Sequence, residues 1–188
     1  MAELAELRRR LELSGNKELV KLILELAKLR KDNAAWLEAK LCGSEKHSES
    51  IEHYKQKILS GFYKRSGWPQ LKLSEAKRAI SDFKKASKDN ALLIDLMIFY
   101  VETGTEFTRK YGDIDERFYS SMETMYDDAV KLLNRIGDAV LIDKFRQRLE
   151  DIVTKTKGMG WGYHDTLGDI YEELGSSSGE SYGQKSSK

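Results

Sequence analysis

The 188-residue sequence contains one cysteine, Cys42, and one proline, Pro69. A single cysteine cannot form an intramolecular disulfide, and we expect Cys42 to act as a small buried or half-buried apolar residue rather than as a catalytic thiol. The sequence also lacks a secretory signal and an apolar run of 18 residues. These absences predict a cytoplasmic protein of a reducing compartment that does not use a membrane as a partner.

Runs of β-branched residues are also missing, and no segment alternates apolar and polar residues as a strand would. Apolar residues instead recur every three or four positions through most of the chain. The sequence therefore predicts an all-α fold, with eight or nine helices that form antiparallel helical hairpins in a bundle or an irregular curved stack. We expect a single helical domain at residues 1–174 and a disordered Ser/Gly-rich tail at residues 175–188.

The most regular apolar spacing lies between Ala91 and Leu133. It predicts two amphipathic helices around an acidic turn at residues 109–116, in which Gly112 ends the first helix and Asp115 caps the second. Gly137 and Asp138 are expected to end that helix and to cap the next one. Further helices are predicted at 2–13, 17–31, 34–41, 51–65, from 74 onward, and at 164–174, with loops at 43–50, 66–69 and 158–162.

Two of the early segments carry specific packing expectations. The apolar residues of the 17–31 helix form a stripe wide enough to be buried against more than one neighbour, and Asn16 is expected to cap that helix. Trp36 and Leu37 are expected to anchor the short helix that follows in a core. Ser74 is expected to cap the helix that it begins.

The net charge of +1 hides an uneven distribution. Residues 1–90 carry 20 Lys and Arg against 13 Asp and Glu, and residues 91–188 carry 12 against 18. Such a distribution is typical of a surface that docks partners, and equally of two parts of one fold that attract each other.

The first candidate binding surface is basic and lies between Tyr54 and Lys88. A surface that combines cations with aromatic rings can hold phosphates by charge while unpaired bases stack on the rings. The alternative is a solvated helix face whose aromatic residues belong to the core. The candidate residues for nucleic-acid or partner binding are Lys64, Arg65, Trp68, Lys77, Arg78, Lys84 and Lys85.

The second candidate is the acidic turn with Asp113, Asp115 and Glu116, together with His164. Carboxylates at this spacing could supply part of the oxygen shell of a divalent cation, but the glycine and the twelfth-position glutamate of a calcium loop are missing. Capping and solubility are the alternative role. His164 could carry protons, although its neighbour Asp165 cannot face it on a helix, and a histidine bonded to the backbone is the alternative.

A third candidate is the glycine-rich segment at residues 155–162, which could cradle a phosphate on backbone amides at the start of a helix. No strand precedes this segment, so the context of a nucleotide-binding loop is missing. The alternative is a tight bend that tucks Trp161 and Tyr163 between helices.

Three long segments, at residues 71–85, 100–133 and 158–174, occur in the same order as in a known group of proteins. In these segments the sequence resembles a family of small, uncharacterised bacterial helical proteins classed as a domain of unknown function. The resemblance implies a bacterial helical domain and assigns no catalytic residue and no cofactor.

Three functional hypotheses follow from these observations. The preferred one is a non-enzymatic scaffold that binds an unidentified protein partner through its basic N-terminal and acidic C-terminal halves. The alternatives are single-stranded nucleic-acid binding through residues 54–88 and a metal-dependent enzyme that uses the acidic turn and His164. The sequence assigns no catalytic residue, no metal ligand and no cofactor, and it leaves the oligomeric state open.

Overall fold

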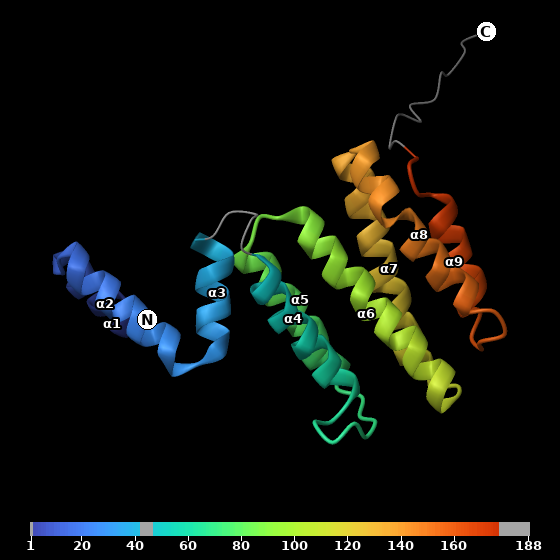
Figure 1. The fold of residues 1–188 in the computed structure, drawn as a ribbon, viewed down its shortest axis with the longest axis horizontal. Coiled ribbons are helices and arrows are strands. Elements are labelled where there is room, and N and C mark those ends of the chain that lie inside the picture. The colour runs from blue at the N-terminus through green and yellow to red at the C-terminus, as the bar shows by residue number, and fades with distance from the viewer. Residues whose placement is uncertain (1, 42–46, 177–188) are drawn as a thin grey trace, which may run out of the picture. The chain divides into compact units, whose positions relative to one another are not determined.

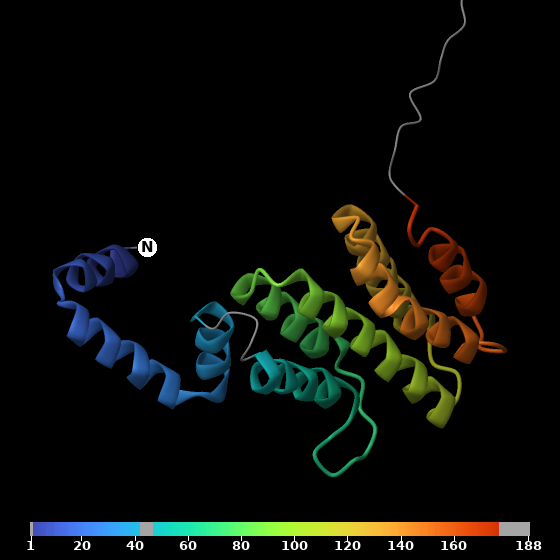
Figure 2. The same ribbon diagram turned by 45° about the horizontal axis from the view of Figure 1, so that its top comes forward.

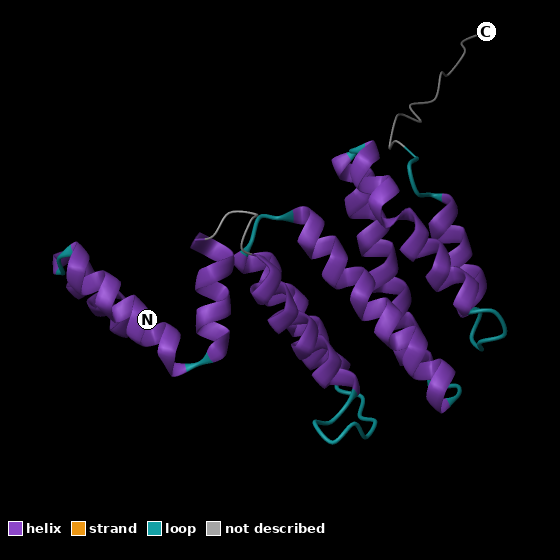
Figure 3. Ribbon diagram, viewed as in Figure 1, coloured by secondary structure: helices purple, strands orange, loops and turns teal. Residues whose placement is uncertain are grey.

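A computed structural model of the chain describes residues 2–41 and 47–176. These residues form nine α-helices and no strand, apart from an isolated bridge between Tyr63 and Pro69 (Figure 3). The predicted all-α fold with eight or nine helices is confirmed. No helix in the described ranges has both the length and the apolar character needed to cross a membrane.

The chain divides into two compact units, Met1–Ser50 and Ile51–Lys188. The first unit contains α1 (Ala2–Leu13), α2 (Asn16–Leu29) and α3 (Lys31–Leu41), and α4 (His47–Phe62) begins at its end. The second unit contains most of α4 and then α5 (Leu73–Ala86), α6 (Asn90–Tyr111), α7 (Glu116–Ile136), α8 (Ala139–Lys155) and α9 (Tyr163–Glu172).

Helix α6 is the centre of the second unit, because it packs against α5, α7 and α8, while α9 packs on α7 and α8 (Figures 1 and 2). Twelve of its 22 residues are buried, so it is apolar on almost every side. Aromatic rings connect α4 to this core: Phe62 lies 5.4 Å from Tyr100 and 6.0 Å from Phe107, between ring centroids. The Ala91–Leu133 region is therefore the core, as its dense apolar spacing indicates.

The ends of the central helices follow the predicted capping residues. The Asp115 side chain accepts a hydrogen bond from the backbone N–H of Phe118, and Asp138 caps α8 in the same way. Gly137 has a left-handed conformation with φ of 66°, which glycine adopts without a steric penalty. These caps fix the directions of α6, α7 and α8, so the antiparallel hairpins of this unit can be derived from short sequence signals.

Four ionic side chains join α4, α6 and α8. Arg148 on α8 donates to both carboxylate oxygens of Glu102, at 2.8 and 2.7 Å, and also to Asp95 on α6. Lys55 on α4 lies 2.8 Å from Asp95. Burial alone would raise the pKa of Asp95, but the hydrogen bonds from Lys55 and Arg148 outweigh burial and lower it.

This lowered pKa predicts a pH dependence of stability. A carboxyl group with a lower pKa in the folded state stabilises the fold above its ordinary value of 3.8, and this contribution is lost as the pH falls through the folded-state pKa. Asp95→Asn should therefore be less stable than the parent at pH 7, and the difference should shrink below about pH 4. Urea unfolding at several pH values measures this difference in stability between the parent and Asp95→Asn. A difference that stays constant down to pH 3, or that appears equally in Asp143→Asn on the surface, would contradict this assignment.

The first unit contains many apolar side chains and no buried one among those described in α2. The predicted burial of the α2 stripe is therefore not found within this unit, and Trp36, expected to anchor a core, is 44% exposed. Helix α2 packs on α3 but keeps most of its apolar surface uncovered. The exposed large apolar residues of α1 and α2 are Leu4, Leu7, Leu11, Leu13, Val20, Leu22, Ile23, Leu24, Leu26 and Leu29.

Three local predictions differ from the structure. Helix α4 begins at His47, so residues 47–50 are helical rather than part of a loop. Asn16 lies within α2 and Ser74 within α5, and neither helix has a side-chain cap, because both begin one residue earlier than expected. Cys42 and nearly all of the predicted tail, at residues 177–188, lie outside the described residues.

Candidate functional site

The basic surface of α5 is determined by the burial of its other side. Ala76, Ala79, Ile80 and Phe83 are buried in the core of the second unit. Because helical residues at spacings of three, four and seven share a face, this burial leaves the intervening positions in solvent. The side chains exposed in this way include Lys77, Arg78, Lys84 and Lys85, which we call the α5 basic face.

The ion pairs of the α5 basic face are weak. Asp82 on α5 lies 3.9 Å from both Arg78 and Lys85, at the limit of an ion pair, and Lys77 lines a cavity together with Glu116 and Asp128 of α7. Arg78 and Lys85 remain 82% and 73% exposed. Such long, solvated contacts contribute little stability, so both cations can exchange them for contacts with a binding partner.

The loop between α4 and α5 carries the other basic candidates. Its backbone turns at residues 64–67, where Gly67 donates to Lys64 with an N···O distance of 2.8 Å and has φ of 80°. Lys64 in turn donates to the carbonyl oxygen of Trp68, and Gln70 donates from its side chain to the carbonyl oxygen of Ser60. These bonds order the backbone of the loop, and the Trp68 side chain on it is 70% exposed, close in sequence to Lys64 and Arg65.

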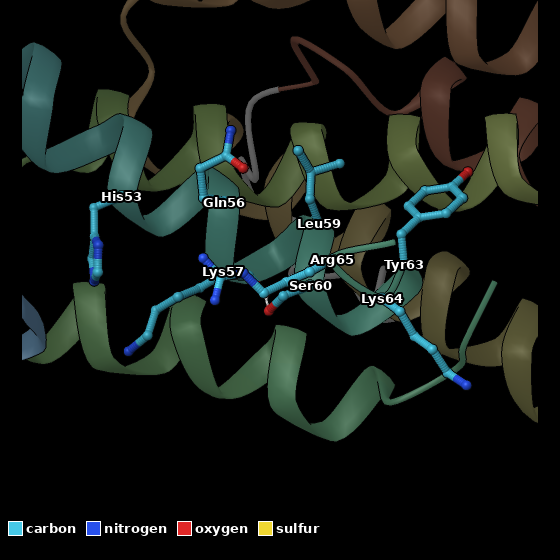
Figure 4. Close-up of a pocket in the computed structure, with 8 residues that line it drawn as sticks. All are labelled: His53, Gln56, Lys57, Leu59, Ser60, Tyr63, Lys64 and Arg65. Atoms are coloured by element: carbon cyan, nitrogen blue, oxygen red, sulfur yellow. Dashed lines mark hydrogen bonds between the residues drawn. The ribbon is translucent and has the colours of Figure 1, made fainter. Parts of the chain in front are cut away.

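A cavity of about 540 Å³ lies along α4 beside this loop. Its lining comes from successive turns of α4 and from the start of the loop (Figure 4). The lining contains three cations, an aromatic ring and no carboxylate, so it suits an anionic ligand. The lining residues are His53, Gln56, Lys57, Leu59, Ser60, Tyr63, Lys64 and Arg65.

The charges of the second unit are segregated along the chain. Residues 51–90 carry ten Lys and Arg against four Asp and Glu, and residues 91–176 carry ten against 17. Lys55 on α4 forms an ion pair with Asp95 on α6, so attraction between the two parts contributes this contact. The α5 basic face, by contrast, is exposed to solvent.

The acidic candidates do not form one site. Asp115 caps α7, and Glu116 lines a separate cavity together with Lys77. The His164 ring nitrogen Nδ1 lies 3.0 Å from both the Thr156 hydroxyl and the Val153 carbonyl oxygen, which is the backbone contact expected of a structural histidine. In the described part of the chain, no group of three or more His, Cys, Asp or Glu residues is placed to hold a metal ion.

Asp113 does meet the glycine-rich segment. Its carboxylate lies so close to Gly160 that a Cβ atom there would be 2.8 Å from it. Tyr119 donates to Asp113 at 2.5 Å, and the Thr108 hydroxyl lies 2.8 Å from the Tyr119 oxygen. Burial and the bond to the carboxylate raise the pKa of Tyr119, so its hydroxyl remains a donor at neutral pH.

The same contact borders a second cavity, of about 510 Å³, between the α6–α7 turn and the α8–α9 loop. Arg109, Lys155 and Lys157 line it together with the glycines. Glu106 lies 3.1 Å from Arg109 and 3.0 Å from Lys155, and the Lys155 bond lowers the pKa of Glu106. Two of the three cations are thus already paired, which weakens the phosphate cradle that the glycine-rich segment indicates. Tyr163 is buried as predicted, whereas Trp161 is 57% exposed.

Sequence reasoning missed part of this geometry. The cavity on α4 could have been found, because His53, Gln56, Lys57 and Ser60 recur at spacings of three and four and therefore share one helix face. Tyr119 and Thr108 could not have been assigned to Asp113 from the sequence. Their contacts span the α6–α7 turn, and the contact of Asp113 with Gly160 depends on how this turn packs against a loop more than 40 residues later.

The fold and its surfaces define an all-α protein of helical hairpins, in which the α4–α5 hairpin is basic and the following residues, 91–176, are acidic. Residues 4–175 match a family of unknown function (DUF6155), so the chain belongs to this family. The match confirms the resemblance to a domain of unknown function. Neither the curated proteins nor the solved structures gave a match to the chain.

Proposed function

We propose that the protein is a non-enzymatic interaction scaffold whose α5 basic face binds an acidic surface of a partner protein. The observation that carries the proposal is the arrangement of α5, where four cations share one solvent-exposed face and two of them, Arg78 and Lys85, form only long contacts of 3.9 Å with Asp82. The buried side of the same helix holds this face on a rigid core, which lowers the entropic cost of binding.

The charge of the α5 basic face affects how fast and how selectively it binds a partner. A basic patch draws an acidic partner toward the correct face and repels other basic surfaces, so it contributes to association rate and specificity. The acidic part of the second unit would orient the same partner by repulsion. The residues considered for catalysis support a scaffold, because Asp115 is engaged in capping and Asp113 and His164 in contacts that hold loops.

Binding of a labelled poly-glutamate peptide, measured by fluorescence anisotropy, tests the proposal. Reversal of the α5 basic face by Lys77→Glu, Arg78→Glu, Lys84→Glu and Lys85→Glu should raise the apparent Kd about tenfold or more. The matched control reverses four exposed cations elsewhere: Arg135, Lys144, Arg146 and Lys157. Both variants change the net charge equally, so equal losses of binding would contradict a specific role of α5.

Single-stranded nucleic acid is a second candidate ligand, favoured by the exposure of Trp68 beside Lys64 and Arg65. An exposed indole next to cations can stack on a base while the cations contact phosphates, and each stacked base contributes about 1–3 kcal/mol. Trp68→Ala separates the two candidates. It should weaken binding of a labelled single-stranded RNA if bases stack there, and should leave binding of the acidic peptide unchanged.

A further inference from the structure

The first unit carries an unpartnered apolar surface on α1 and α2. With the roughly 100° turn per residue of an α-helix, the five charged residues of α2 fall within an arc of about 100°, and its apolar residues span about 220°. An isolated helix of 14 residues with this composition is marginal in water, because helices of this length depend on packing of their apolar face. A surface of this width needs a partner.

We propose that this surface pairs with the same surface of a second copy of the chain. The a and d positions of a parallel two-stranded coiled coil are spaced alternately by three and four residues. Leu19, Leu22, Leu26 and Leu29 of α2 have this spacing. The proposal is independent of the function proposed for the α5 basic face, because it uses other residues.

The available area agrees with a dimer. A standard interface buries about 800 Å² per partner, of which about 60% is apolar, or roughly 500 Å². The ten exposed apolar side chains of α1 and α2 are on average about half exposed. Full burial of one such side chain removes on the order of 100 Å² from water, so together they offer about 500 Å².

The charges of α2 disfavour a membrane as the partner of this surface. The charged arc of α2 contains three lysines and two glutamates, so it lacks the strongly basic character that draws a helix to an anionic membrane.

Between residues 51 and 176, the second unit has no apolar stripe of comparable length. The exposed large apolar residues described there are single positions on different loops and helices. Trp68 and Leu71 lie in the loop after α4, Tyr111 ends α6, Val140 begins α8, and Trp161 lies in the loop before α9. A second copy of α1 and α2 supplies a surface of the required length, and scattered residues do not.

The molar mass in solution, measured by light scattering after size exclusion, tests the proposal on the full chain. We expect twice the 21.6 kDa of one chain. Leu22→Asp combined with Leu26→Asp should give the monomer mass, whereas Val140→Asp, which replaces an exposed apolar residue of the second unit, should leave the dimer intact. A monomer at micromolar concentration, or a dimer that survives both seam substitutions, would overturn the proposal.

Dilution of the parental chain keeps the test independent of folding defects, because it changes no residue. The molar mass should fall from the dimer value toward 21.6 kDa as the chain concentration is lowered below the dimer dissociation constant. Binding of anionic lipid vesicles by a chain that is monomeric at every concentration would overturn the proposal and identify a membrane as the occupant instead.

Discussion

Arg148→Met is expected to destabilise the second unit by about 2–3 kcal/mol, because it leaves the carboxylates of Asp95 and Glu102 without their shared cation. Removing one member of a fully buried ion pair costs about 3–5 kcal/mol, and the Arg148 side chain is 32% exposed, which reduces the loss. Burial alone would lower the pKa of Arg148, but its bonds to both carboxylates raise it. The arginine therefore stays charged.

Arg146→Met provides the matched control on the same helix. Arg146 pairs with Asp143 at 3.4 Å on the surface, where such a pair contributes about 0–1 kcal/mol. Urea unfolding followed by circular dichroism measures both variants. A loss of stability in Arg148→Met no larger than that in Arg146→Met would mean that the four-residue ionic contact does not hold α4, α6 and α8 together.

Gly61→Ala should also destabilise the protein, by about 1–2 kcal/mol, although alanine favours a helix over glycine by about 1 kcal/mol. A Cβ atom at Gly61 would lie 2.7 Å from the Cβ atom of Ala76 and 3.1 Å from the Lys72 carbonyl oxygen. Neither neighbour is a flexible side chain, so α4 and α5 must move apart. The change should lower the melting temperature by several degrees.

Gly168→Ala should change stability in the opposite direction from Gly61→Ala. Gly168 lies in α9, where an added Cβ atom would have nothing within 4 Å. The higher helix propensity of alanine is then the main effect, so the free energy of unfolding should rise by up to about 1 kcal/mol. Differential scanning calorimetry of both variants measures the two signs, and a stabilised Gly61→Ala would show that the α4–α5 contact is looser than the structure has it.

The second unit was largely predictable because its signals are local. Asp115, Gly137 and Asp138 act within one turn of their own positions, and the apolar spacing of α5 is enough to place Lys77 and Lys84 on the opposite, solvated side. Such features depend on helix geometry alone. They required no knowledge of which helices pack together.

The first unit was less predictable because apolar spacing identifies a face that needs a partner but not the partner itself. The apolar stripe on α2 predicts a helix buried in a core, and Trp36 is predicted to anchor a core. Both nevertheless remain exposed within their unit. A partner outside the chain leaves the same sequence pattern as a neighbour inside it. The self-association proposed above accounts for this difference.

The candidate site residues also fall into two groups, those whose position follows from the sequence and those whose position depends on tertiary packing. The α5 basic face follows from spacing, whereas the separation of Asp113, Glu116 and His164 depends on the packing of α7, α8 and α9. Carboxylates close in sequence have different surroundings here, because Asp113 lies against Gly160 while Glu116 lines a separate cavity together with Lys77.

Lysine acetylation footprinting of the full chain, with and without the poly-glutamate peptide, locates the surface that binds the peptide. The proposed function predicts that peptide binding protects Lys77, Lys84 and Lys85 on α5, while Lys144 on α8 and Lys157 in the loop before α9 react at unchanged rates. All five side chains are exposed, so each reports on its own surroundings. Protection spread evenly over the five lysines, or confined to Lys144 and Lys157, would contradict a binding surface on α5.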